Sequence, residues 1–198
     1  MATDPRISAP AAARNRDPIL DVLRQVLPES GLVVEIASGT GEHVAQFAAA
    51  LPGLTFQPTE PDAERRRSID AWAEGLANVR PAMALDASVA WDVGPCSAVL
   101  CINMIHIAPW AATRGLLSGA AAALGQGGAL VLYGPYRRGG VHTAASNAEF
   151  DASLKSRNPE WGVRDLETVT AEAVRAGFTG PEVFEMPANN LTVVFRCT

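Results

Sequence analysis

The hydrophobic and polar positions of the chain follow two periods, one typical of buried strands and one typical of amphipathic helices. Short apolar runs rich in β-branched residues predict strands, and longer stretches with apolar residues three and four apart predict helices. The predicted strands cover 32–37, 54–57, 79–85, 97–102, 128–133, 182–186 and 191–196. The predicted helices cover 18–27, 43–51, 63–76, 109–124, 148–155 and 165–176.

Strands that alternate with helices predict a doubly wound α/β sheet, in which parallel strands are joined by right-handed crossovers. The last two strands are joined by only four residues, 187–190, which is too short for a parallel crossover, so they should be antiparallel neighbours. We expect a flexible leader over residues 1–13 and a single domain over 14–198. Residues 134–164 break the regular pattern and predict a lid or substrate-binding insertion within that domain.

Composition limits the classes of partner. The 198 residues are 48% hydrophobic and 19% charged, which supports one domain with its own core. Sixteen basic and 21 acidic residues argue against a nucleic-acid-binding protein, because such binding depends on neutralising phosphates. No apolar run approaches the ~18 residues of a membrane span, and the first residues do not follow the order of a secretory signal. Cys96, Cys101 and Cys197 form no metal or disulfide pattern, so we expect a cytoplasmic protein.

The turn after the first predicted strand carries the most informative residues. Ligands of open α/β sheets bind beyond the carboxyl ends of the strands, and Gly39 and Gly41 would let the backbone bend there and approach a ligand closely. Val44 stands where a dinucleotide fingerprint needs its third glycine, and no lysine of a phosphate-binding loop is near. The carboxylate of Glu35 suits a cation, such as the ammonium and sulfonium of S-adenosylmethionine. A structural turn with an incidental glutamate is the alternative.

Two more acids follow the next two predicted strands. Glu60 stands 21 residues after Gly39, where an acid can accept hydrogen bonds from two ribose hydroxyls. Asp86 ends the third predicted strand, where it can accept from an adenine amino group while Leu85 and Ala87 pack on the ring. A single acid at a strand end is usually a turn former, but three at successive strand ends favour a binding site.

With these residues, the chain resembles the class I S-adenosylmethionine-dependent methyltransferases, and most closely the methyltransferase-like protein 26 group and its bacterial relatives. The matching stretches are 14–20, 35–43, 57–62, 103–110, 134–136, 146–151, 157–162 and 187–191. The resemblance implies a Rossmann-like, seven-stranded, mostly parallel sheet of order 3-2-1-4-5-7-6, with strand 7 antiparallel and helices on both faces. It implies S-adenosyl-L-methionine as cofactor and S-adenosyl-L-homocysteine as product. The residues expected to bind the cofactor are Glu35, Ala37, Gly39, Gly41, Glu60, Pro61, Asp86, Ala87, Asn103 and Met104.

Three side chains are candidates for catalysis, His106, Tyr136 and Asp151. They are expected near the carboxyl ends of the fourth and fifth strands, where the methyl acceptor must be aligned. An ordinary histidine has a pKa near 6.5, so His106 could take a proton from the acceptor at neutral pH. A histidine that ties a loop to the backbone is an equally good interpretation.

Arginine and aromatic residues before the first helix and in the insertion favour a small polar or anionic acceptor. The candidates for binding it are Arg14, Asn15, Tyr133, Tyr136, Arg137, Asn147, Phe150, Arg157 and Trp161. No cluster of carboxylates and histidines has the spacing of a metal site, so no metal is expected. The predicted activity is methyl transfer to an O, N or S atom of a small molecule. The alternatives are a methyltransferase acting on RNA or protein, and a module that binds the cofactor without turnover.

Overall fold

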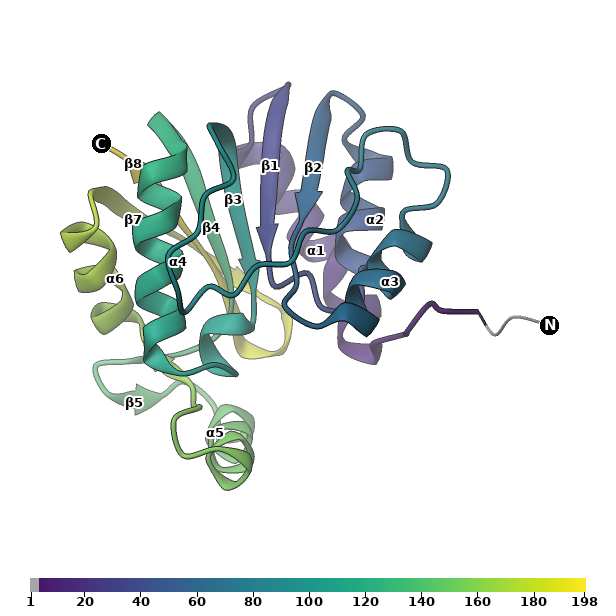
Figure 1. Ribbon diagram of the computed structural model, residues 1–198. Helices are drawn as coiled ribbons and strands as arrows, with labels where there is room; N and C mark the ends of the chain where they lie inside the picture. The colour runs from purple at the N-terminus through teal and green to yellow at the C-terminus, as the bar shows by residue number, and fades with distance from the viewer. Residues whose placement is uncertain (1–3) are drawn as a thin grey trace.

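The computed structural model describes residues 4–198, and its centre is a mixed sheet (Figure 1). Six long strands lie in the order β2-β1-β3-β4-β8-β7. They are β1 (Gly31–Ile36), β2 (Leu54–Pro58), β3 (Cys96–Ile102), β4 (Leu124–Arg138), β7 (Phe178–Met186) and β8 (Asn190–Cys197). The first four are parallel to one another, and β8 is antiparallel to both β4 and β7. Two short strands, β5 (Val141–His142) and β6 (Arg164–Asp165), pair with the end of β4.

This topology confirms the expected α/β fold, including the antiparallel final strand. The expected strand over 79–85 is wrong, because this segment forms only two isolated bridges, Val79 with Phe56 and Met83 with Thr59. Pro81 lies between the two bridges and has no backbone N–H to donate, which interrupts the ladder. The segment nevertheless runs beside β2, so its end reaches the same edge of the sheet.

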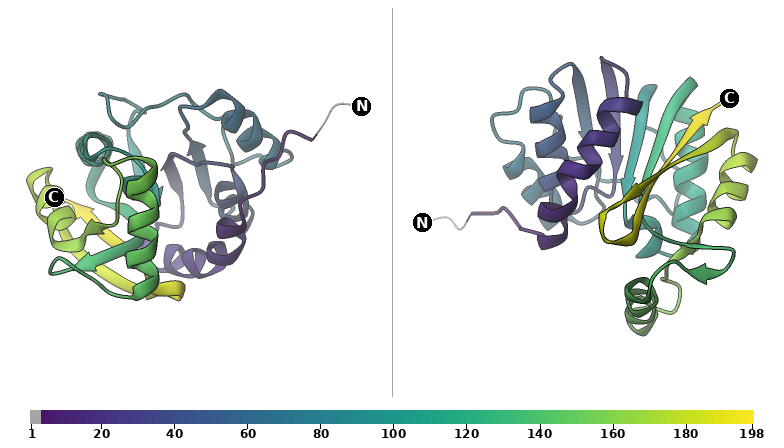
Figure 2. Two further views of the ribbon diagram at one scale, coloured as in Figure 1. Left: turned by 90° about the horizontal axis from the view of Figure 1, so that it is seen from below. Right: turned by 180° about the vertical axis from the view of Figure 1, so that it is seen from behind.

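Helices cover both faces of the sheet, as expected. One face carries α1 (Pro10–Val26), α2 (Glu42–Ala50) and α3 (Ala63–Trp72), and the other carries α4 (Trp110–Ala123) and α6 (Leu166–Arg175). Figure 2 shows α1 crossing the back of the sheet. Side chains of a strand alternate between faces, so Val33 packs with α1 and α2 whereas Val34 packs with α4. Among residues 4–198, no helix has both the length and the apolar character that crossing a bilayer requires.

The first helix begins earlier than the sequence pattern indicated. It starts at Pro10 rather than at Pro18, so residues 10–13 of the expected leader are helical, and that part of the prediction is wrong. Pro10 has the favourable first helical position, while Pro18 lies inside the helix. The helix continues past Pro18, because the apolar residues on the buried side of α1 pack against the sheet. Residues 1–3 of the expected leader lie outside the described residues.

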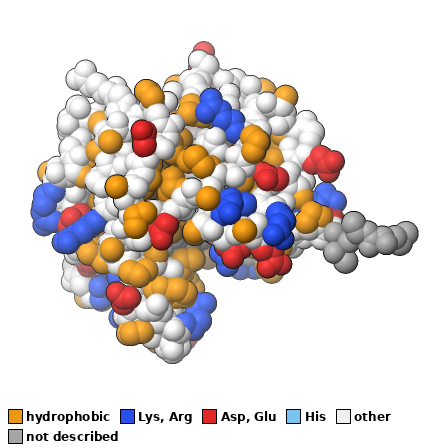
Figure 3. Space-filling model, viewed as in Figure 1, with side chains coloured by type: hydrophobic (Ala, Val, Ile, Leu, Met, Phe, Trp, Pro, Cys, Tyr) orange, Lys and Arg blue, Asp and Glu red, His pale blue; other side chains and the backbone are white. Residues whose placement is uncertain are grey.

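Only part of the predicted insertion over 134–164 lies outside the central sheet. Residues 134–138 continue β4, and Tyr136 is fully buried in the core. The remainder forms β5 and α5 (Ala145–Arg157), which is longer than the helix expected over 148–155. This part projects beyond the carboxyl ends of the strands as a lobe (Figures 1 and 3).

Two glycines of α4 let residues 86–91, which follow the segment 79–85, pack closely on this helix. A Cβ atom on Gly115 would lie 1.8 Å from the carbonyl oxygen of Ala87, and one on Gly119 would lie 2.1 Å from Cε2 of Trp91. The indole N–H of Trp91 also donates to the carbonyl of Gly115 at 3.1 Å. These contacts fix the path of residues 86–91, which begin at the carboxyl edge of the sheet.

We predict that Gly115→Ala lowers the free energy of unfolding by about 1–3 kcal/mol, because the new methyl group cannot fit without moving the backbone of Ala87. Urea unfolding followed by circular dichroism measures the change. Gly125→Ala is the control, since a Cβ atom there meets nothing within 4 Å. Equal stability of Gly115→Ala and the wild type would contradict the packing described.

Candidate functional site

A pocket of about 440 Å³ opens at the carboxyl ends of β1, β2 and β3. This volume lies in the ~300–1,000 Å³ range of small-molecule sites. Nine of the residues expected to bind the cofactor line the pocket: Glu35, Ala37, Gly39, Glu60, Pro61, Asp86, Ala87, Asn103 and Met104. The tenth, Gly41, precedes α2 and instead packs on α3, where an added Cβ would lie 2.6 Å from Cα of Ile69. The three strand-end acids therefore share one pocket.

Glu35 is the most unusual of these acids, because it is 1% exposed at the end of β1. Its Oε2 atom has no hydrogen-bond partner among residues 4–198. Burial, with a smaller contribution from the charge of Glu60, raises the pKa of Glu35 to about 7, while a hydrogen bond from Ser38 acts in the opposite direction. A buried carboxylate oxygen without a hydrogen-bond partner is costly, so this site favours a cationic or hydrogen-bond-donating ligand.

Glu60 links the end of β2 to the glycine turn. Its carboxylate accepts a hydrogen bond from the Gly39 N–H at 3.0 Å and another from the Asp62 N–H at 3.3 Å. Each carboxylate oxygen can accept more than one hydrogen bond, so a ligand donor can still reach this buried group. Gly39 has a φ of +61°, and a Cβ atom there would meet nothing within 4 Å, so the turn leaves open space beside Glu60.

The third acid, Asp86, is exposed at the rim of the pocket. Its Oδ1 accepts hydrogen bonds from the hydroxyl of Ser88 at 2.7 Å and from the Ser88 N–H at 2.8 Å. These bonds hold the pKa of Asp86 below its usual value. The buried side chains of Leu85 and Ala87 on either side give the rim an apolar surface next to a fixed charge.

Several residues that line the pocket were not expected from the sequence. Ala9, Ala11 and Ala12 come from the expected leader and the first turn of α1. Ile107, Ala108 and Ala112 come from the start of the α4 region. Alanines carry no chemical signal, and only the proline at the first position of α1 could have indicated an ordered helix start here.

The expected catalytic residues lie outside this lining. His106 is fully buried, its Nδ1 accepts the Arg164 N–H at 3.2 Å, and its Nε2 has no partner among the described residues. Burial lowers the pKa of His106 to about 3, and the charge of Arg164 adds to the effect. The ring packs edge-on against Tyr136 with 5.1 Å between centroids. Of the two interpretations of this histidine, the geometry favours the one in which it ties a loop.

Tyr136 and Asp151 are also buried outside the pocket lining, but their surroundings differ. Burial raises the pKa of Tyr136, and its hydroxyl has no partner within the described chain. The carboxylate of Asp151 accepts the Val163 N–H at 2.8 Å and pairs with Lys155 at 2.6 Å. Burial alone would raise the pKa of Asp151, but these hydrogen bonds hold it below its usual value. Catalysis by these residues stays a prediction that no contact with the pocket supports.

Apart from Tyr136, which is fully buried in the core, the residues expected to bind the acceptor fall into two groups. In the first group, Asn15 Oδ1 lies 2.8 Å from Nε2 of His43, a half-buried side chain that lines the pocket. Desolvation lowers the pKa of His43 to about 4, and the charge of Arg16 contributes, so the ring is neutral at pH 7. Burial raises the pKa of Tyr133, although hydrogen bonds with Asn15 and Asn190 and the nearby Arg14 act in the opposite direction. This group forms a polar wall that reaches the pocket through His43.

The second group lies at the carboxyl edge around α5. Asn147 donates to the hydroxyl of Thr143 and to the carbonyl of Asn189, and Arg157 stacks over Trp161. Phe150 is 39% exposed. Arg137 stands at the end of β4, where its charge acts on Asp165. Viewed from below, α5 and the N-terminal segment lie on opposite sides of this edge (Figure 2).

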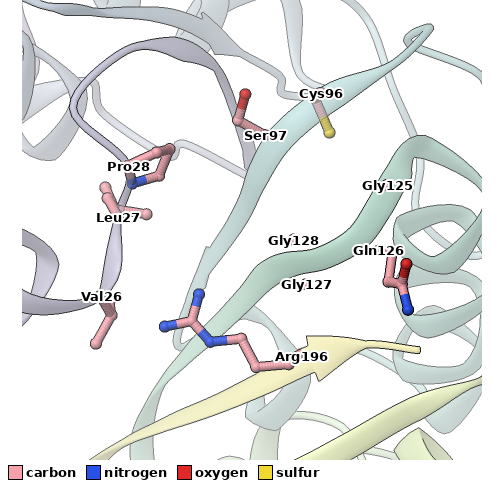
Figure 4. Close-up of a pocket in the computed structure, with 10 residues that line it drawn as sticks. All are labelled: Val26, Leu27, Pro28, Cys96, Ser97, Gly125, Gln126, Gly127, Gly128 and Arg196. Atoms are coloured by element: carbon pink, nitrogen blue, oxygen red, sulfur yellow. The ribbon is translucent and has the colours of Figure 1, made fainter.

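A second hollow, of about 500 Å³, lies at the opposite edge of the sheet (Figure 4). It lies between the end of α1, the first residues of β3 and β4, and the end of β8. Of its lining residues within the described chain, Arg196 alone carries a charge. In residues 4–198, no group of three or more histidine, cysteine or acidic side chains is placed to hold a metal. The acids therefore distinguish the pocket at the carboxyl edge.

Comparison with protein families shows which family the chain belongs to. The model of the family described as "Protein of unknown function (DUF938)" matches residues 6–197. The chain belongs to DUF938. The matched range starts before Ala9, so it includes the N-terminal residues that line the pocket of this DUF938 chain.

Solved structures with the same fold are methyltransferases by name. An O-methyltransferase family protein from Burkholderia thailandensis has a TM-score of 0.78 and 19% identity, with 95% of this chain and 57% of that chain covered. Human N-acetylserotonin methyltransferase in complex with SAM has a TM-score of 0.80 and 13% identity, with 94% and 52% covered. Mitomycin 7-O-methyltransferase has a TM-score of 0.80 and 16% identity, with 95% and 54% covered. The DUF938 chain thus has the class I methyltransferase fold and spans little more than half of these proteins.

We predict that Glu35→Gln changes how stability depends on pH. The folded-state pKa of Glu35 is raised from 4.5 to about 7, so the wild type binds more protons when folded and loses stability as pH rises between these values. Relative to the wild type, the variant should gain about 3 kcal/mol between pH 4.5 and pH 8. Urea unfolding at both pH values measures this gain. Parallel curves for the two proteins would show that Glu35 is not buried as described.

Proposed function

We propose that this chain is an S-adenosylmethionine-dependent methyltransferase that moves a methyl group to an O, N or S atom of a small-molecule acceptor. The observation that carries the proposal is the buried Glu35 carboxylate, whose Oε2 has no partner among residues 4–198 and which lines a pocket with Glu60 and Asp86. This arrangement is unsuited to phosphate groups, which are anions. It suits a ligand with a cationic end and several hydroxyl and amino donors.

The residues present fit such a ligand. Glu35 would accept hydrogen bonds from the ammonium group, and Glu60 would accept them from the ribose hydroxyls. Asp86 would accept from the adenine amino group, with Leu85 and Ala87 against the ring. When bound, the cofactor supplies an electrophilic methyl group on a sulfonium, and S-adenosylhomocysteine is the product. Nucleotide cofactors that carry phosphates would place anions beside Glu35, so the same residues disfavour them.

The contribution of the chain to the reaction is mainly positioning. Aligning two reactants can supply as much as ~7–11 kcal/mol, and the apolar Ala12 and Met104 in the pocket lining help to exclude water. His43, which contacts Asn15 and is neutral because desolvation lowers its pKa, offers the acceptor a polar group at the edge of the pocket. His106 is a poor general base, because its pKa is lowered to about 3 and its ring is buried away from the pocket lining.

The comparisons support a small-molecule acceptor. The names of the structural neighbours include N-acetylserotonin methyltransferase and mitomycin 7-O-methyltransferase. Basic and acidic side chains are interspersed on the face shown in Figure 3, without a broad basic surface that would suit RNA. The acceptor itself and the relationship to the methyltransferase-like protein 26 group stay predictions.

We predict that Glu60→Ala weakens binding of S-adenosylmethionine by about 1–3 kcal/mol, because hydrogen bonds between a carboxylate and the ribose would be lost. Isothermal titration calorimetry measures the dissociation constants. Glu149→Ala on α5 is the matched control, since this exposed acid does not line the pocket. Equal affinity of Glu60→Ala and the wild type would contradict the assignment of the ribose site.

Transfer of a labelled methyl group tests the activity. Purified protein, S-adenosylmethionine with a radioactive methyl group, and a cell extract that holds metabolites, RNA and proteins are incubated together. We expect label in small molecules. Label in RNA or protein would instead support the macromolecular alternative, and cofactor binding without any transfer would support a binding module.

A further inference from the structure

The N-terminal segment forms one wall of the pocket, a role that the proposed chemistry does not explain. We call residues 6–12 the strap. Ala9, Ala11 and Ala12 line the pocket, and none of them has a polar side chain with which to recognise a ligand. The strap therefore encloses the pocket and contributes no polar side chain to ligand recognition.

Helix α3 holds the outer end of the strap. The Ile7 N–H donates to Oγ of Ser68 at 2.9 Å, and the carbonyl of Ile7 accepts the indole N–H of Trp72 at 3.0 Å. The guanidinium of Arg6 also lies 5.6 Å from the centre of the Trp72 ring, within the range of a cation–π contact. Both backbone polar groups of Ile7 are thus bound to side chains more than 60 residues away.

Glu42 holds the inner end of the strap, where the pocket begins. The Ala9 N–H donates to Oε2 of Glu42 at 2.6 Å, and the Thr40 hydroxyl donates to the same oxygen at 3.3 Å. The Glu42 side chain is buried at the start of α2. A hydrogen bond from a backbone N–H to a carboxylate is among the stronger neutral-to-charged contacts, so this one defines where Ala9 lies.

The same side chains also hold the glycine turn. Ser68 accepts from Ile7 and donates its hydroxyl hydrogen to the carbonyl of Thr40 at 2.7 Å. Thr40 lies between Gly39 and Gly41 and lines the pocket. The strap and the glycine turn therefore share two hydrogen-bond partners, Glu42 and Ser68.

We propose that the strap is the wall that opens for the nucleoside to leave, and that Glu42 and Ser68 are positioning residues that set how long the nucleoside stays bound. The inference rests on the proposed function, because it concerns the same pocket. The part of the strap that precedes α1, residues 6–9, is held to α2 and α3 by three hydrogen bonds and one cation–π contact, so it can open locally without unfolding of the sheet. The closed strap covers the pocket with alanine, and release requires these bonds to break.

Stopped-flow kinetics with S-adenosylhomocysteine test the proposal. In Glu42→Ala we expect the dissociation rate constant to rise at least tenfold, with a smaller change in the association rate constant. Glu42→Gln should restore most of the wild-type rate, since its amide oxygen can still accept the Ala9 N–H. Glu149→Ala should leave both constants unchanged. Ile7→Pro removes the N–H that binds Ser68 without changing a buried side chain, so it tests the strap if Glu42→Ala does not fold.

Hydrogen exchange of the Ala9 amide gives a second readout that needs no ligand. Exchange in the free protein should be at least tenfold faster in Ile7→Pro and Glu42→Ala than in the wild type. If the wild type binds S-adenosylhomocysteine and every strap variant releases it with the same dissociation rate constant as the wild type, the inference is overturned and the proposed function stays intact. Failure of the wild type to bind S-adenosylhomocysteine would contradict the proposed function itself and overturn both.

Discussion

The burial of one carboxylate, that of Glu35, is the constraint on which the rest of the site depends. The strand that carries it, β1, lies between β2 and β3, so Glu35, its penultimate residue, is enclosed by neighbouring strands and by helices on both faces. An ionised carboxylate in such a place loses its hydration, which is why its pKa rises to about 7. A bound ligand can offset the free energy that the carboxylate loses on leaving water, and a positively charged ligand offsets the most.

The topology of the sheet brings two further acids to the pocket that Glu35 lines. The parallel strands β1 and β2 bring Glu35 and Glu60 to one edge, and the segment 79–85, bridged to β2 at two residues, brings Asp86 to the same pocket. The glycine turn between them stays open because Gly39 has a positive φ and no side chain. The close packing of α4 on residues 86–91 then fixes the third acid.

The features that could be predicted from the sequence are those that follow from strand order. Alternating apolar periods predicted the sheet, and the position of acids at strand ends predicted the pocket lining. The strap could not be predicted, because its bonds join the backbone of Ile7 and Ala9 to side chains far along the chain and leave no pattern in an alanine-rich segment. The surroundings of His106 could not be predicted either, since its burial depends on how Arg164 and Tyr136 pack around it. The strand predicted over 79–85 does not form, because Pro81 interrupts the ladder although the segment is apolar.

The pKa of Glu35, followed by carbon NMR of its labelled carboxyl group, tests whether this buried carboxylate is arranged to bind a cation. The resonance is identified by its loss in Glu35→Gln, and the titration is run on the free protein and with saturating S-adenosylmethionine. We expect a pKa of about 7 in the free protein and a marked decrease when the ligand is bound. An ordinary pKa in the free protein, or a raised pKa that the bound ligand leaves unchanged, would contradict it.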